Sequence, residues 1–178
     1  IQLDGNSVLA LNKRANTYLA INQPDNAGPD LDAVLQLDPK NAYAFGNRGW
    51  AFRQKKLYKE SINDFSKAIK FKEQNAWAYQ MRGLSYLDLL NYEMAIKDFS
   101  EVINIDPKHY WAHNNRGICY MHTQYYELAI NDFTKAIDLN PNPTDAYSRR
   151  GYTMAKMSRF EQAVDDYSMA IQLAPAIP

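Results

Sequence analysis

Two periods govern the order of hydrophobic and polar residues along the chain. Within short segments apolar residues are three and four positions apart, as at Ile62, Phe65 and Ile69, which is the spacing of one face of an amphipathic helix. Over longer distances the pattern returns every 34 residues, because Arg-Gly pairs stand at 48–49, 82–83, 116–117 and 150–151. A fixed period of this length predicts a tandem array of one supersecondary unit.

Each repeat reads as two helices. Aligning the repeats predicts the ranges 8–41, 42–75, 76–109, 110–143 and 144–177. In the second repeat we expect helices over roughly 42–55 and 58–71, with Asn41 positioned to cap the first; Asn75 is the equivalent cap for the third repeat. Four repeats close with a proline that disfavours continued helix. A small residue at the eighth position lets the paired helices approach closely.

Two regions depart from the pattern. In the first repeat, Pro24, Gly28 and Pro29 fall where the second helix should run, so we expect a loop followed by a short helix from near Pro29. This degenerate segment is either a decayed repeat, which we favour, or a hinge or partner-facing loop. Residues 1–7 match the tail of a preceding repeat, and no polar capping helix closes the far end. These features predict a piece of a longer array or of a larger protein.

Arginine at the seventh position and aspartate at the twenty-third occur in all five repeats. A row of this kind is either a catalytic or anion-binding ladder or a structural one. We favour the structural reading, in which each arginine pairs with an aspartate on an adjoining helix of its own or a neighbouring repeat, because a guanidinium offers bidentate donors and stays charged. The residues are Arg14, Asp30, Arg48, Asp64, Arg82, Asp98, Arg116, Asp132, Arg150 and Asp166.

The chain resembles the tetratricopeptide repeat family over residues 8–177. The family's signature of aromatic, glycine, alanine and proline positions is met in the third and fourth repeats. The residues are Tyr79, Gly83, Tyr86, Ala95, Phe99, Val102 and Pro107, then His113, Gly117, Tyr120, Ala129, Phe133, Ala136 and Pro141. His113 replaces the aromatic and Val102 the alanine. The resemblance implies an all-α, right-handed superhelical solenoid of antiparallel helix pairs, about five repeats long, whose concave face binds an extended peptide or a partner helix.

The predicted concave face follows from helical geometry and from this resemblance. The second, fifth, ninth and twelfth positions of each first helix lie roughly opposite the packing fourth, eighth and eleventh, and all three tryptophans of the chain fall in that set. Exposed aromatic patches mark binding surfaces, although these rings have the alternative of packing against a neighbouring repeat. Asparagine and glutamine side chains nearby suit a ligand's backbone. The candidate binding residues are Asn12, Asn16, Tyr43, Asn47, Trp50, Trp77, Gln80, Leu84, Trp111, Asn114, Asn115, Ile118, Arg149 and Tyr152.

Some family members hold the terminal carboxylate of cytosolic heat-shock chaperones with a set of lysines, asparagines and an arginine. Over the last three repeats only Asn115 and Arg149 match that set, and over the first three the cations are missing. We therefore do not expect chaperone-tail binding by this route.

Composition narrows the class of partner. Lys plus Arg and Asp plus Glu both total 20, so a nucleic-acid or anionic-membrane footprint is not expected, and no apolar run is long enough for membrane insertion. The single cysteine, Cys119, reads as a buried thiol and is compatible with a reducing compartment such as the cytoplasm. His113 and His122 face opposite sides of one helix, and no phosphate loop or hydrolase motif is found. We expect no cofactor, no metal site and no catalysis.

Three functions remain open. The first is a non-catalytic module that binds a partly apolar protein or peptide segment in an aromatic groove. The second is a scaffold or oligomerisation segment that self-associates through exposed repeat ends. The third is a regulatory arm of a larger enzyme, which is compatible with either of the others.

Overall fold

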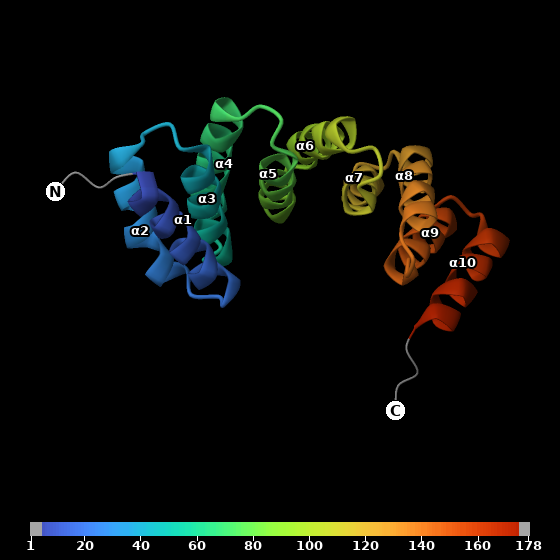
Figure 1. The fold of residues 1–178 in the computed structure, drawn as a ribbon. Coiled ribbons are helices and arrows are strands. Elements are labelled where there is room, and N and C mark those ends of the chain that lie inside the picture. Colours follow the sequence, from blue (N-terminus) through green and yellow to red (C-terminus); the bar gives the residue numbers. More distant parts are fainter. Residues whose placement is uncertain (1–4, 175–178) are drawn as a thin grey trace. The chain divides into compact units, whose positions relative to one another are not determined.

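The computed structural model describes residues 5–174, which form ten α-helices and no strand (Figure 1). They divide between Leu90 and Asn91 into two compact bodies, here called the N-terminal and C-terminal bodies. The N-terminal helices are α1 Gly5–Ala20, α2 Pro24–Leu37, α3 Ala42–Gln54, α4 Tyr58–Phe71 and α5 Ala76–Asp88. The C-terminal helices are α6 Tyr92–Ile105, α7 Tyr110–His122, α8 Tyr126–Leu139, α9 Thr144–Lys156 and α10 Phe160–Leu173.

Successive helices pack against each other within each body, and the first helices of successive repeats also touch. In the N-terminal body α1 contacts α3 and α3 contacts α5, while in the C-terminal body α7 contacts α9. Within each body the first helices therefore form a layer of their own, and that layer carries the predicted concave positions. The repeat boundaries themselves stay a prediction. Of the predicted tail 1–7, residues 1–4 lie outside the described part of the chain and the remainder belongs to α1.

The helix ends and close approaches follow the sequence pattern. The Asn41 and Asn75 side chains cap α3 and α5 by accepting the backbone N–H of Ala44 and Ala78, at 2.9 and 3.1 Å. A Cβ on Gly117 would lie 2.8 Å from the Phe133 ring. The eighth-position glycine of this repeat is therefore required for contact between α7 and α8.

The expected loop at the start of the second helix is wrong. Helix α2 begins at Pro24 and contains Pro29 within it. Pro24 occupies the first turn, where its missing N–H costs nothing. Pro29 leaves one helical hydrogen bond unmade, but Ala27, Leu31 and Val34 on the same helix are all fully buried in the core. Tertiary packing of this apolar face therefore holds a helix that local propensity argues against.

Each repeat turns between its helices on a residue with positive φ that is not glycine. These residues are Asn22, Lys56, Leu90, Gln124 and Ser158, with φ between 57 and 63°. In the fourth repeat the N–H of Tyr125 bonds the carbonyl of Tyr120, and that of Gln124 bonds Met121. This is the Schellman ending, which glycine usually supplies. Every first helix thus ends on a mildly strained residue.

Candidate functional site

A hollow of about 740 Å³ lies over the layer of first helices in the N-terminal body. It brings together six of the predicted binding residues from three different helices. Its lining consists of Val8, Leu9, Asn12, Lys13, Asn16, Asn41, Ala42, Tyr43, Asn47, Trp50, Lys72, Asn75 and Trp77. Gln80 and Leu84, half-buried on α5, are not among these residues.

Two tryptophans form the apolar wall of this hollow. The rings of Trp50 and Trp77 meet edge to face with centroids 6.3 Å apart, and Trp77 meets Phe65 in the same way at 5.6 Å. Trp77 nevertheless stays 38% exposed. Its ring fits because the facing residue of α3 is Gly46, where a Cβ would lie 2.7 Å from Trp77 Cζ3. Trp77 is therefore seated by packing and still open to a ligand.

Amide groups line the same hollow. The Asn12 side-chain oxygen is buried and accepts no hydrogen bond within the described residues, and a buried polar atom of this kind is costly without a partner. Asn16 is exposed and Asn47 half-buried. Asn41 and Asn75 differ from them, because their oxygens already cap helices. Asn16 and Asn47 are thus open to a ligand's backbone, whereas the Asn12 side chain lines the hollow with its oxygen enclosed.

Several predicted residues of the C-terminal body line separate and smaller cavities. Trp111, which is 50% exposed, and Asn114 line a cavity of about 300 Å³, while Arg149 and Tyr152 line another of about 340 Å³. Asn114, Asn115 and Ile118 are 5, 9 and 9% exposed, respectively. Their role as ligand contacts stays a prediction, and the burial of Asn115 and Ile118 does not favour it.

The arginines and aspartates of the ladder meet within their own repeats. Arg14, Arg48, Arg116 and Arg150 each donate two hydrogen bonds to the aspartate sixteen residues on. The distances are 2.7 and 2.6 Å to Asp30, 2.6 and 3.2 Å to Asp64, 2.7 and 2.9 Å to Asp132, and 2.8 and 2.7 Å to Asp166. Asp98 is buried like the other four aspartates. This bidentate geometry is the strong form of the ion pair.

The remaining guanidinium nitrogen reaches the preceding repeat. In the second to fifth repeats Nη1 donates to a polar side chain sixteen residues earlier. The acceptors are Asp32, Ser66, Ser100 and Thr134, at 2.8, 2.9, 3.0 and 2.9 Å. Sequence reasoning missed these acceptors, although an oxygen-bearing residue stands at the twenty-fifth position of every repeat. Each of these arginines therefore ties its own helix pair to the one before it.

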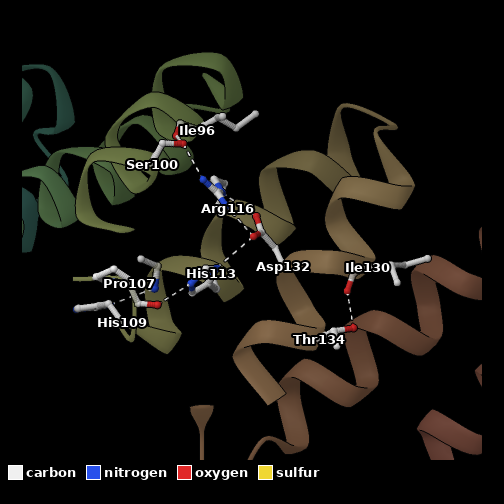
Figure 2. Close-up of polar contacts among 10 residues, drawn as sticks. Ile96, Ser100, Pro107, His109, His113, Arg116, Ile130, Asp132 and Thr134 are labelled. Carbon is white, nitrogen blue, oxygen red and sulfur yellow. Dashed lines mark hydrogen bonds and ion pairs between the residues drawn. The ribbon is translucent and has the colours of Figure 1, made fainter. Parts of the chain in front are cut away.

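The fourth repeat adds a histidine to its ion pair (Figure 2). His113 lies with Nδ1 3.2 Å from Asp132 Oδ1 and Nε2 3.2 Å from the Pro107 carbonyl oxygen. Burial alone would raise the pKa of Asp132, but hydrogen bonds from Arg116 and His113 outweigh burial and lower it. The hydrogen bond to Asp132 in turn raises the pKa of Arg116. Asp132 and Arg116 are thus an ionised pair at neutral pH, packed between helices.

The described part of the chain offers few side chains suited to catalysis or metal binding. Cys119 is fully buried, and burial raises the pKa of its thiol to about 12, which makes it a poor nucleophile. Between residues 5 and 174, no three His, Cys, Asp or Glu side chains are grouped as a metal ion would require. None of the helices in that range combines the length and apolar character of a bilayer-spanning segment.

Comparison with solved structures supports the fold. A crystal structure of MamA is 20% identical, with a TM-score of 0.85 and coverage of 97% of this chain and 96% of that chain. YrrB, described as a TPR protein with an unusual peptide-binding site, is 23% identical, with a TM-score of 0.83 and coverage of 93 and 86%. MamA 41-end from Desulfovibrio magneticus RS-1 is 18% identical, with a TM-score of 0.88 and coverage of 95 and 96%. No curated protein sequence matches the chain.

Family models identify the repeats directly. One model of the tetratricopeptide repeat matches residues 12–76, and a second matches 76–109 and 110–143. Together they span most of the chain, and the fold is the all-α solenoid expected of such repeats. Family and fold support a protein-interaction module. The chain belongs to the tetratricopeptide repeat family.

Proposed function

We propose that the chain is a non-catalytic module that binds a partly apolar peptide segment, extended or helical, in the hollow of the N-terminal body. The observation that carries this proposal is the hollow itself, because it joins the exposed faces of Tyr43, Trp50 and Trp77 to amides without intramolecular partners. Its volume of about 740 Å³ lies within the range of built ligand sites. Tryptophan and tyrosine are the side chains that most often dominate binding energy.

The fold agrees with this proposal. YrrB, which shares the fold, is a TPR protein with a peptide-binding site. At 23% identity that likeness supports the use of such a fold for peptides and says nothing of which residues bind here. The residue assignment rests on the hollow alone.

A peptide-array screen with tryptophan variants tests the proposal. Peptides that bind the parent protein should lose binding to Trp50→Ala and Trp77→Ala and keep it with Trp111→Ala, which removes a half-exposed tryptophan from the other body. Because Trp77 also packs against Phe65, Asn16→Ala provides a second variant. Asn16 is exposed and makes no side-chain hydrogen bond to any described residue, so we expect Asn16→Ala to weaken binding with little effect on folding. Unchanged binding in all three N-terminal variants would show that the hollow is not the site.

Self-association is a second candidate, favoured by one observation on α10. Phe160, Val164 and Ile171 lie on one face of that helix and are 64, 62 and 76% exposed. A contiguous apolar face of this kind favours contact with another protein surface. Light scattering during size-exclusion chromatography at increasing concentration should then show an oligomer that Val164→Lys abolishes. A monomer at every concentration would exclude this candidate.

A further inference from the structure

We propose that the hollow selects a partner segment carrying a side-chain carboxylate next to an apolar residue. This inference rests on the proposed function and concerns the charge of the hollow. Its lining contains two lysines, Lys13 and Lys72, and no aspartate or glutamate. The whole chain has zero formal charge, so the lining itself is more positive than the chain, with Asp38 just behind it as an acceptor from the Asn41 amide at 2.9 Å.

The two lysines are available to a ligand. Two nearby cations of the same body are paired, Arg53 with Asp88 at 2.6 Å and Lys55 with Asp25 at 2.6 Å. Lys13 and Lys72, by contrast, form no ion pair with any residue between 5 and 174. A carboxylate from a partner would therefore not have to displace an internal one.

Lys72 is held in place at the hollow by an aromatic ring. Its Nζ lies 4.9 Å from the centre of the Tyr43 ring and donates a hydrogen bond of 3.1 Å to the Tyr43 hydroxyl. An ammonium group has three donors, so Lys72 keeps two for a ligand while its position is restrained. Tyr43 is 67% exposed and lines the hollow beside Lys72.

The surrounding groups favour an internal segment over a chain terminus. Trp50 and Trp77 supply an apolar wall, while Asn16 and Asn47 supply amides for a main chain. These amides come from two different helices, α1 and α3, so a backbone can be held at more than one point along its course. The occupant is thus an acidic side chain within a peptide whose neighbouring apolar residue contacts the tryptophans.

Matched synthetic peptides test this charge preference. Three pools share the same content of Leu, Phe and Trp and carry Glu, Gln or Lys at the remaining variable positions, with each pool made with a free and an amidated C-terminus. Binding is measured by fluorescence anisotropy at low and high salt. We expect the Glu pool to bind the parent protein about 3- to 10-fold more tightly than the Gln pool, as two partly exposed ion pairs allow, with the gap shrinking as salt rises.

Lysine substitutions test whether Lys13 and Lys72 cause the preference for the Glu pool. Lys13→Met combined with Lys72→Met should bring the affinity for the Glu pool down to that for the Gln pool. Lys59→Met combined with Lys70→Met is the matched control, because both lysines are exposed on α4 and outside the lining. If the parent protein bound the Glu and Gln pools equally and Trp77→Ala bound neither, the charge preference would be wrong and the proposed function would stand. If the preference required a free C-terminus, the ligand would be a chain end and not an internal segment. If no pool showed binding that depends on the tryptophans, the proposed function itself would be wrong.

Discussion

Replacing Arg116 with alanine should destabilise the fourth repeat strongly. The substitution removes two hydrogen bonds to Asp132 and one to Ser100, which belongs to the preceding repeat. Asp132 is only 5% exposed, and it would keep His113 as its one remaining side-chain partner from α7. The cost is therefore that of a buried carboxylate that has lost its main counter-charge.

The structure sets the size of this effect. Removing one partner of a buried ion pair costs about 3–5 kcal/mol. The Arg116 side chain is 20% exposed, and His113 still donates to Asp132, so we expect the lower end, about 3 kcal/mol. Arg14→Ala should cost less, because the Arg14 side chain is 61% exposed and water can replace it at Asp30.

Urea unfolding measures the difference. Helix content by circular dichroism and the fluorescence of Trp111, which lies on the same helix as Arg116, should both move to lower urea. With a slope of about 1–3 kcal/mol per molar urea, the midpoint falls by roughly 1–3 M. Arg116→Lys, which keeps the charge and loses the bidentate contact, should fall between alanine and the parent. A midpoint for Arg116→Ala equal to that of the parent, or a larger loss for Arg14→Ala, would refute the reasoning.

Three further predictions follow from particular residues. The difference in unfolding free energy between the parent and Asp132→Asn, here called the stability gap, should be constant above about pH 4, the usual carboxylate pKa. It should shrink as the pH falls further. The reason is that the folded-state pKa of Asp132 is lowered, so its stabilisation is lost as acid protonates the folded carboxylate; urea titrations across pH measure the gap. Cys119, whose pKa burial raises to about 12, should react with a thiol reagent only as the protein unfolds, as stopped-flow absorbance would show. Gln124→Gly should raise the unfolding free energy by about 0.5 kcal/mol, because φ there is 63° and glycine relieves that strain at some entropic cost; thermal unfolding measures it.

Two of these predictions have a matched control. Asp165→Asn changes an exposed carboxylate on α10 and should show no gap that depends on pH in this way. Lys135→Gly places glycine inside α8 and should destabilise by about 1 kcal/mol, opposite in sign to Gln124→Gly. A constant gap for Asp132→Asn down to pH 2, rapid labelling of native Cys119, or a lower midpoint for Gln124→Gly would each contradict its prediction.

The sequence predicted the repeat family, the all-α fold and several local packing features. The caps at Asn41 and Asn75 and the small eighth-position residues depend on local chemistry that recurs in each copy, so the alignment of repeats finds them. The exception is Pro29, where a local signal for loop was overruled by the buried face of α2. That outcome depends on contacts with other helices, which no single repeat encodes.

The candidate site was harder to predict because it depends on differences between repeats. Helical geometry places Trp50 and Trp77 on one side, but only the structure shows that Gly46 makes room for the Trp77 ring. The two lysines were also missed. Lys13 stands one position from the predicted set, and Lys72 follows the second helix of its repeat.

The division between scaffold and site follows from what each part of the repeat must do. Ladder positions bond within and between repeats, so every copy needs them, and a change such as Arg116→Ala should alter stability without altering which peptide binds. The fifth position faces the other way and is free to vary, with asparagine, glycine, glutamine, asparagine and serine in the five copies. At this position Gly46 leaves room for the Trp77 ring, and Asn12 carries a side-chain oxygen without a hydrogen-bond partner among the described residues. Asn16→Ala should therefore weaken binding while leaving the urea midpoint unchanged, the reverse of the arginine variant. If Asn16→Ala and Arg116→Ala each changed both the urea midpoint and peptide binding, recognition and scaffold would not be separated in this way.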